Sequence, residues 1–598
     1  MATTPVSQEL RRGGAFLVAA ATPEEIFTPA DLTDDQRLIG QTTEEFVTKE
    51  VLPLIPELEK HAKGVLPGLL KKAGEIGLLG GIIPEQYGGA QLDKVATTVL
   101  AEKLAAYASM AVAHGGHAGI GTIPLVYFGS EEQKKKYLPK LATGEWLACY
   151  CLSEPQAGSD AQASRTRAVL SPDGKSWILN GQKMWITNGG FADVFTIFAK
   201  VDGDKFSCFL IERGAPGFSI GGEENKMGIR GSSTVPLFFE NASIPKENLL
   251  HEIGRGHIVA FNTLNAGRFS LGAYCLGGAK KAIADSAKYA KERTAFGKPI
   301  AEFGLIQAKL GEMTVRTYAL ESMIYRTAGN IEAAVSAGES GPDKTKAAMQ
   351  TLEEYAIESS ISKVAGSEIL DYCVDEGVQI FGGYGFHEDY PMARAYRDSR
   401  INRIFEGTNE INRLLIVDML MKRAMKGTLP LVAAGKKLAD EILAGPSFEA
   451  APAGEFAAEQ QAIAQAKKAF LLVSGAAVQQ FMDKLAQNEE IVASLSNIVI
   501  EIYAMESSLL RAEKAAAAKS DAAGLMGDAA RTYIYDAVDR VEKEARTALA
   551  ATVDGDTLTT QLAVLRRFVK HAPVDAISLR RKIAQTVLAH TRYPFDGR

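Results

Sequence analysis

The feature that constrains this chain most is a change from helical to strand-like periodicity and back again. Over residues 33–140, apolar residues recur at the three- and four-residue spacing of amphipathic helices. Over residues 148–245, short β-branched and aromatic runs alternate with turn sequences such as P-D-G-K and V-D-G-D. Helical spacing returns at His257 and continues to about Met425. We therefore expect an antiparallel barrel or sandwich between two helical domains.

A second helical region follows a loose segment, Ala444–Glu455, which has the composition of a linker. Its Ala-, Glu- and Lys-rich helices carry no cluster of potential catalytic groups, which is typical of packing or oligomerisation. The fold class expected for the whole chain is α+β, mainly α. We expect five parts: an N-terminal extension (1–32), a helical domain (33–147), a β domain (148–260), a helical bundle (261–428) and a helical extension (429–598).

Composition excludes several classes of function. The chain has 598 residues, a formal net charge of −6 and a pI near 5.9, so we expect no nucleic-acid partner. Its five cysteines contain no CxxC pair and are too sparse for a disulfide framework, and we expect no metal site. These features fit a reducing compartment, so the expected location is the cytoplasm, or the mitochondrial matrix face if the chain is eukaryotic.

Two segments resemble targeting or membrane signals. Arg11 and Arg12 precede a short apolar run, as in a secretory signal, but Glu9 comes before them. Residues 104–130 carry no formal charge and are long enough to span a bilayer, yet four glycines and Pro124 interrupt them. We expect a buried helix, a loop and a second helix there.

The first candidate for chemistry is Glu406, in the stretch R-I-F-E-G-T-N-E-I-N-R. Ile404 and Phe405 are expected to be buried, and Thr408 is expected to cap a following helix. Glu406 would then lie outside the helix beside apolar neighbours, where desolvation raises a carboxyl pKa towards the range of a general base at neutral pH. The alternative is an ordinary surface glutamate in a turn.

Two segments of the β domain suit a planar ligand. The stretch C-L-S-E-P-Q-A-G-S-D-A-Q-A begins at Cys151 and offers hydroxyls and a glycine, and M-W-I-T-N follows at residues 184–188. Alternation places Trp185 and Thr187 on one face of a strand. A flat aromatic ring with hydroxyl and backbone donors suits a heterocycle with a polar rim, such as a flavin.

A glycine-rich stretch, Q-I-F-G-G-Y-G-F-H-E-D-Y-P-M-A-R-A-Y-R-D, occupies residues 379–398. Its glycines allow the backbone to approach a phosphate or a nucleotide. The spacing differs from the Rossmann fingerprint, and no βαβ unit surrounds it.

Together and in this order, these segments resemble the acyl-CoA dehydrogenase family, from Thr33 to about Met425. R-T-A-F-G-K at 293–298 matches too. Three features look most like the very-long-chain branch of the family: the long C-terminal extension and the stretches L-N-A-G-R-F and F-G-L-I-Q. The resemblance implies an N-terminal helical domain, a middle antiparallel β-barrel and a C-terminal four-helix bundle, plus an extra C-terminal helical domain.

The resemblance also implies a site. Glu406 matches the catalytic base, and Gly267 stands where a minority of the family carries the base instead. Matches to the FAD-binding positions are Tyr150, Leu152, Ser153, Gly158, Ser159, Trp185, Ile186, Thr187, Arg293, Phe296, Phe303, Gln379, Ile380, Phe381, Gly382, Gly383, Thr408 and Glu410. Matches to substrate positions are Ser159, Asn265, Arg268, Glu406 and Gly407, and the small residues Gly115 and Gly116 are expected to leave room for a longer acyl chain.

The implied reaction is FAD-dependent α,β-dehydrogenation of a fatty acyl-CoA to trans-2-enoyl-CoA, the first step of fatty acid β-oxidation. Glu406 would take the α-proton while the β-hydride passes to flavin N5, and electrons would then pass to electron-transfer flavoprotein. The neighbouring subunit would grip the adenosine half of FAD, which implies at least a homodimer.

Alternatives remain open at this point. An acyl-CoA oxidase would use the same fold and base but pass electrons to oxygen, and a non-catalytic assembly protein could use the same scaffold. The segment Ala462–Val473 is apolar with two lysines, so it could lie at a membrane interface or in the core of the extension.

Overall fold

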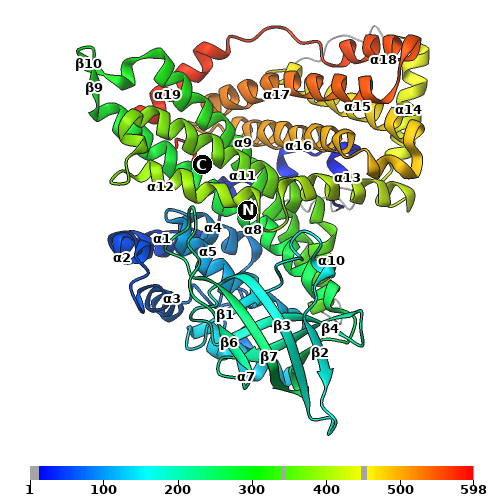
Figure 1. Cartoon of the computed structure of the whole chain (residues 1–598). Coiled ribbons are helices and arrows are strands. Elements are labelled where there is room, and N and C mark those ends of the chain that lie inside the picture. Colours follow the sequence, from blue (N-terminus) through cyan, green and yellow to red (C-terminus); the bar gives the residue numbers. More distant parts are fainter. Residues whose placement is uncertain (1–11, 339–343, 446–453, 597–598) are drawn as a thin grey trace.

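The computed structural model describes residues 12–338, 344–445 and 454–596. A small β domain lies at one end of the molecule, and the long helices of the bundle and the extension stack away from it (Figure 1). The predicted linker lies mostly outside the described residues.

The N-terminal domain is helical, as the periodicity predicts. Thr33 caps its first helix by accepting a hydrogen bond from the Gln36 backbone N–H, and the Gln36 side chain accepts one in return. A π-helical turn, Gly115–Gly119, follows α5. The helices are α1 (Asp34–Phe46), α2 (Ile55–Glu59), α3 (Val65–Glu75), α4 (Lys94–Leu104), α5 (Ala108–His114), α6 (Ile123–Phe128) and α7 (Glu131–Thr143).

The β domain is one sheet with strand order β6-β7-β3-β2-β4-β5-β8, and β1 pairs with β4. Most pairings are antiparallel as expected, but β1 and β2 both run parallel to β4. β1 and β2 run in the same direction because the segment 152–166 carries the chain back along the sheet between them. β2 is parallel to β4 because β3, which is antiparallel to β2, comes between them in the chain. The strands are β1 (Ala148–Cys151), β2 (Arg167–Leu170), β3 (Ser176–Thr187), β4 (Val194–Val201), β5 (Lys205–Glu212), β6 (Phe218–Ile220), β7 (Thr234–Pro245) and β8 (Leu249–Leu250).

The C-terminal bundle packs four long helices around one apolar core. The first begins at Gly256, so the domain boundary expected at 260 falls inside it. The elements are α8 (Gly256–Glu292), the hairpin β9 (Thr294–Ala295) and β10 (Lys298–Pro299), α9 (Gly304–Gly338), α10 (Lys344–Glu354), α11 (Ala356–Phe381), α12 (Pro391–Ser399) and α13 (Asn409–Met425).

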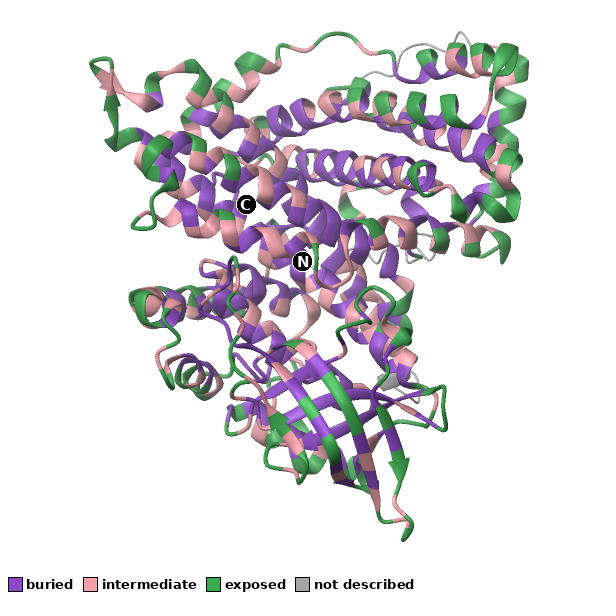
Figure 2. Cartoon of the chain, viewed as in Figure 1, coloured by how far each residue is buried: buried purple, intermediate pink, exposed green. Residues whose placement is uncertain are grey.

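The extension shares its core with the bundle and is not a separate unit. Buried residues run continuously through α9, α11 and α16, while the exposed ones follow the outer helices (Figure 2). In the segment Ala462–Val473, Ile463, Phe470 and Val473 are buried, so its apolar face lies in this core. The helices are α14 (Leu431–Ala444), α15 (Ala457–Phe481), α16 (Glu489–Ala517), α17 (Ala523–Thr552), α18 (Gly555–Phe568) and α19 (Ala576–His590).

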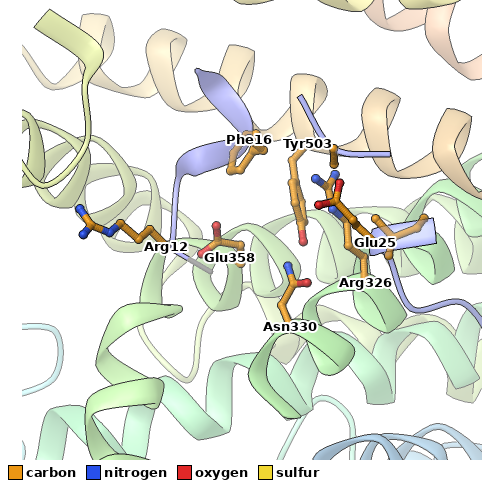
Figure 3. Close-up of a pocket in the computed structure, with 9 residues that line it drawn as sticks. Arg12, Phe16, Glu25, Arg326, Asn330, Glu358 and Tyr503 are labelled. Atoms are coloured by element: carbon orange, nitrogen blue, oxygen red, sulfur yellow. The ribbon is translucent and has the colours of Figure 1, made fainter. Parts of the chain in front are cut away.

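The described part of the N-terminal extension packs across the bundle and the C-terminal extension. Phe16 contacts Tyr503 of α16, with ring centroids 4.7 Å apart, and the Gly14 N–H donates to Glu358 of α11 (2.7 Å). Phe16, Tyr503 and Glu358 help to line a cavity of about 20 Å³ (Figure 3), roughly the size that holds one water molecule. Residues 12–26 thus help to join the two helical blocks.

A buried cluster of charges also joins the blocks. Glu321 of α9 accepts hydrogen bonds from Arg511 of α16 (2.6 Å), from the Tyr593 hydroxyl (2.7 Å) and from Lys280 of α8. Lys280 also donates to Glu102 of α4 (2.7 Å). The Lys280 ammonium therefore occupies the space between carboxylates, and α4, α8, α9, α16 and the C-terminal segment meet at one point.

None of the helices in the described ranges is both long enough and apolar enough to cross a bilayer.

We predict that Glu321→Gln lowers the free energy of unfolding by about 3–5 kcal/mol, because it leaves Lys280 and Arg511 buried without their shared carboxylate. Urea denaturation measures this change. The control is Glu45→Gln, which breaks the exposed Lys49–Glu45 pair and should cost less than about 1 kcal/mol. Equal stability of the two variants would contradict the prediction.

Candidate active site

Glu406 lies in the short segment between α12 and α13 and adopts a left-handed backbone conformation, with φ at +58°. Such a conformation is rare for a residue other than glycine and costs of order 1–3 kcal/mol. Gly407 follows with φ at +79°. The expectation that Ile404 is buried is wrong: it is 49% exposed, and Phe405 is half-buried. Ile404 follows the 3-10 turn Arg400–Arg403 and precedes α13, so no helical face directs its side chain into the core.

Three polar contacts hold this turn in place. The Nε of Arg268 on α8 donates to the Glu406 carbonyl (3.2 Å). The side-chain amide of Asn412 donates to the carbonyls of Gly407 (2.9 Å) and Thr408 (3.0 Å). Thr408 caps α13 by accepting from the Ile411 N–H (3.2 Å), which confirms the cap predicted from the sequence.

Glu406 as a whole is half-buried, but one oxygen of its carboxylate is withdrawn from solvent. Its Oε2 has no solvent-accessible surface and no hydrogen-bond partner in the described part of the chain. Burial raises the pKa of Glu406 to about 7, and the positive charges of Arg268 and Lys363 limit the rise. A carboxylate with this pKa can accept a proton at neutral pH and release it again.

Gly267 makes room for that carboxylate. A Cβ at position 267 would lie 2.7 Å from Glu406 Oε2 and 3.1 Å from a methyl group of Ile120. Any side chain there would displace Glu406. Gly267 is therefore a packing requirement of the base at 406, in addition to lacking a proton acceptor of its own.

The flavin-like side of the site begins at β1. Tyr150 is buried in that strand, and the Ser153 carbonyl accepts from the Met184 N–H of β3 (3.0 Å). Lys183 and Glu154 form a fully buried ion pair (2.6 Å), and Lys183 also donates to the Leu152 carbonyl (3.2 Å). These bonds fix the start of the 152–166 segment.

The middle of that segment is mostly open to solvent, although Ala157 and Ser164 are buried. Glu154 accepts from the backbone N–H groups of Arg165 (2.5 Å) and Thr166, which fixes the far end. Between the two ends, Gly158 and Ser159 are exposed. The segment is thus an anchored loop whose middle is free to contact a ligand.

Trp185 and Thr187 lie at the end of β3, where the register with β7 shifts between Lys183 and Ile186. Trp185 has φ at +58° and leaves its indole 60% exposed, while Ile186 is buried. Only the backbone of Ile186 can therefore contact a ligand. The Thr187 methyl would lie 3.1 Å from a Cβ at Gly116.

The π-helical turn connects these two halves of the site. Gly116 in this turn packs closely against Thr187. Ile120, which follows the turn, packs closely against Gly267, the glycine beside Glu406. The structure therefore brings Thr187 and Glu406 to the same short turn. Asn265 also belongs here, since its Oδ1 accepts from Arg268 (2.8 Å).

Gly115 and Gly116 do not leave free volume, contrary to expectation. A Cβ at Gly115 would lie 3.0 Å from the Tyr274 hydroxyl, and Gly116 is equally close to Asn188. Both glycines permit close packing of the turn. A cavity of about 210 Å³ lies further along α5, lined by Ala111 and Val112 of α5, Leu271 and Tyr274 of α8, and residues of α11 and α12.

A second group of predicted cofactor residues lies far from Glu406 in the same chain. Arg293 comes 25 residues after Arg268, which is about 37 Å along the axis of α8. Phe296 beside it is 96% exposed, and its ring centroid is 6.0 Å from that of Phe303.

The glycine-rich stretch lies at the same end of the bundle, since the Arg293 guanidinium lies over the Tyr384 ring (5.5 Å). Gln379, Gly382 and Gly383 are exposed there, whereas Ile380 and Phe381 are buried. Phe381 stacks on Tyr289 (4.0 Å), so Ile380 and Phe381 can offer only backbone atoms to a ligand. Glu410 is exposed at the start of α13.

Sequence reasoning missed four residues that support the site: Glu154, Lys183, Lys363 and Asn412. Two of them carried a signal. Lys363 interrupts an otherwise uncharged run, S-S-I-S-K-V-A-G-S, and Lys183 alternates with the apolar residues of a strand. A buried charge cannot be recognised from such patterns without knowing its partner.

The donor set fits FAD. An exposed indole, the hydroxyls of Ser153 and Thr187, and an anchored loop with an open glycine suit a flat ring with a polar rim. The Oε2 atom of Glu406, which is buried and has no hydrogen-bond partner among the described residues, borders the same π-helical turn as Thr187. Fold and site together define a flavin-dependent oxidoreductase.

The chain belongs to the acyl-CoA dehydrogenase family. Models of the acyl-CoA dehydrogenase N-terminal, middle and C-terminal domains match residues 33–145, 149–242 and 254–421, and a further acyl-CoA dehydrogenase C-terminal domain matches 465–567. The fold is that of the family with an added helical domain, and the cofactor is FAD.

Three relatives illustrate the similarity. A probable acyl-CoA dehydrogenase of Bacillus subtilis is 46% identical over 98% of this chain and 99% of its own length. The mitochondrial very long-chain specific acyl-CoA dehydrogenase of Bos taurus is 34% identical over 82% of this chain and 77% of its own. The crystal structure of an acyl-CoA dehydrogenase complexed with FAD from Bacillus anthracis is 46% identical, with a TM-score of 0.95 over 97% of this chain and 99% of that one.

We predict that Lys183→Met weakens FAD binding by at least tenfold, because Glu154 then loses its buried cation and the 152–166 loop loses its anchor. The flavin-to-protein ratio and the FAD dissociation constant measure this effect. Lys205→Met, which removes an exposed cation of β5, is the control. FAD binding of wild-type strength in Lys183→Met would show that the anchor is unnecessary.

Proposed function

We propose that Glu406 is the general base of an acyl-CoA dehydrogenation, removing the α-proton of the bound thioester. The observation that carries this proposal is the buried Oε2 atom of Glu406, which a strained backbone holds beside the π-helical turn that Thr187 also contacts. The products are a trans-2-enoyl-CoA and reduced cofactor.

The residues of this chain have distinct tasks in the proposed reaction. Bound FAD supplies the acceptor for the hydrogen that leaves the β-carbon. Arg268 and Asn412 orient Glu406 through its backbone, so the carboxylate is positioned before substrate binds. We assign the Glu406 backbone N–H as a donor to the thioester oxygen, a kind of contact typically worth ~10²–10³ in rate.

We further propose a preference for long acyl chains. From Gly267 beside the base, α8 leads to Leu271 and Tyr274, which line the 210 Å³ cavity. This volume exceeds the roughly 150 Å³ of an apolar cavity able to hold a benzene ring. Similarity to a very long-chain specific relative supports the same proposal.

We also propose that the protein is at least a homodimer. We propose that it passes electrons to electron-transfer flavoprotein and that it is located in the cytoplasm. Phe296 and Phe386 are 96% and 88% exposed at the end of the bundle that carries the second set of cofactor residues. Aromatic side chains this exposed are typical of a surface that another subunit covers. Because the apolar face of Ala462–Val473 is buried, we assign no membrane contact to that segment.

We predict that Glu406→Gln slows anaerobic flavin bleaching by palmitoyl-CoA at least about 10²–10⁴-fold while FAD stays bound, because the amide cannot accept the α-proton. A separate prediction concerns pH. In the wild type, kcat/KM should fall about tenfold per pH unit below pH 7, because Glu406 becomes protonated there and cannot accept the α-proton.

The control for this experiment is Asp418→Asn, an exposed carboxylate on α13. Bleaching of Glu406→Gln at the wild-type rate would remove Glu406 as the base. Mixing the bleached wild-type enzyme with air separates the two enzyme classes, since rapid peroxide formation indicates an oxidase and slow reoxidation a dehydrogenase.

We predict that Ala111→Phe lowers kcat/KM for palmitoyl-CoA relative to butyryl-CoA at least tenfold, because the ring fills the cavity and each excluded methylene loses ~0.8 kcal/mol of burial. A substrate series from butyryl-CoA to a twenty-carbon thioester measures the shift. Ala517→Phe, an exposed alanine on α16, is the matched control. An unchanged length profile in Ala111→Phe would disconnect this cavity from the acyl chain.

A further inference from the structure

Lys363 lies near the centre of the bundle, and its charged side chain is fully buried. It lies on α11 among Ile361, Val364 and Ala365, and it belongs to the largest fully buried side chains of the described chain. Burial lowers the pKa of Lys363 to about 8, and the nearby Cys275 and Glu406 oppose the shift. Burying an ammonium group costs several kcal/mol unless partners compensate it. The position therefore requires a physical reason.

The hydrogen bond of Lys363 points to the base loop. Its Nζ donates to Oδ1 of Asn409 (2.6 Å), the first residue of α13 and three residues after Glu406. The amide of Asn409 donates in turn to Ser367 Oγ (3.0 Å) and Glu368 Oε1 (3.0 Å), both on α11. Both polar ends of the Asn409 side chain are thus fixed by α11.

This arrangement completes the support of residues 406–412. Arg268 of α8 holds the Glu406 carbonyl, and Asn412 holds the carbonyls of Gly407 and Thr408. Asn409 connects the same turn to α11. The left-handed backbone of Glu406 is therefore fixed from two different helices of the bundle.

The charge of Lys363 also acts on Glu406. The groups that influence the Glu406 carboxyl are Arg268 on α8 and Lys363 on α11, and Tyr150 on β1 faces the same carboxylate. Lys363 in turn faces Cys275 and Arg268 on α8, Glu406 and Glu410. Arg268 already bonds the Glu406 carbonyl and Asn265, so Lys363 is a second, independent cation.

We propose that Lys363 is a positioning residue of the reaction, which fixes the base loop through Asn409 and favours the ionised carboxylate of Glu406 before substrate binds. The proposal rests on Glu406 being the base. No proton leaves Lys363 in this role: Glu406 accepts the α-proton, and the ammonium keeps its charge throughout. The cation raises the fraction of enzyme that is ready to react at neutral pH.

The test measures the ionisation of Glu406 directly in the FAD-loaded enzyme without substrate. Difference infrared spectroscopy across pH follows the C=O stretch of the protonated carboxyl, which Glu406→Gln assigns by its loss. We expect Lys363→Met to raise the midpoint by about one unit, as removal of a nearby opposite charge does. The acid limb of the kcat/KM profile for palmitoyl-CoA should move by the same amount, with about tenfold lower kcat/KM at pH 6.

Two further variants separate charge from packing. Lys363→Arg keeps the cation and should restore the midpoint. Lys363→Gln keeps a hydrogen-bond donor for Asn409 but removes the charge, so it should raise the Glu406 midpoint as much as Lys363→Met. It replaces Lys363→Met in the test if that variant does not fold. Lys94→Met is the matched control, because burial also lowers the pKa of Lys94 to about 8, but Glu332 is its charged partner.

A midpoint of Glu406 that stays within 0.2 units (~0.3 kcal/mol) of wild type in Lys363→Met or Lys363→Gln, with FAD bound, would overturn the proposal and leave Lys363 a purely structural residue. This outcome differs from failure of the proposed function. If Glu406 is not the base, the flavin of Glu406→Gln would still bleach with acyl-CoA, whatever the infrared midpoint of the wild type.

Discussion

The left-handed backbone of Glu406 is the constraint on which the site depends. An ordinary helical or extended conformation at this residue would direct the carboxylate elsewhere, and the two hydrogen bonds to the Glu406 and Gly407 carbonyls are made in this conformation. Gly407 continues the turn with its own positive φ, and Gly267 supplies the space that the carboxylate occupies. The strain costs of order 1–3 kcal/mol, so the surrounding helices must hold it.

The large helical scaffold provides that support. Arg268 belongs to a helix of 37 residues, and Asn409 is bonded to α11. The extension stiffens these helices further: its α16 packs on α9 and α13, and the buried cluster around Glu321 joins it to α4 and α8. The β domain contributes Thr187 and the anchored loop, and the π-helical turn joins the two sides.

Much of this could be predicted from sequence, because periodicity and long motifs are local properties. The change of texture at residue 148 located the β domain, and the F-E-G-T stretch located both Glu406 and the cap at Thr408. Features that depend on distant partners could not be predicted. Three features arise from tertiary packing: the parallel pairing of β1 with β4, the exposure of the Ile404 side chain and the cavity beside Ala111. The role of Lys363 needed the position of Asn409, 46 residues away.

Removal of the α-proton by Glu406 can be tested by separating this step from hydride transfer. A thioester whose β-carbon is replaced by sulfur has no β-hydrogen to lose, so only its α-protons can react. We expect the FAD-loaded wild-type enzyme to exchange these α-protons with deuterium in D₂O, as followed by NMR, and Glu406→Gln with FAD bound not to exchange them. Exchange at the wild-type rate in Glu406→Gln would show that another group removes the α-proton.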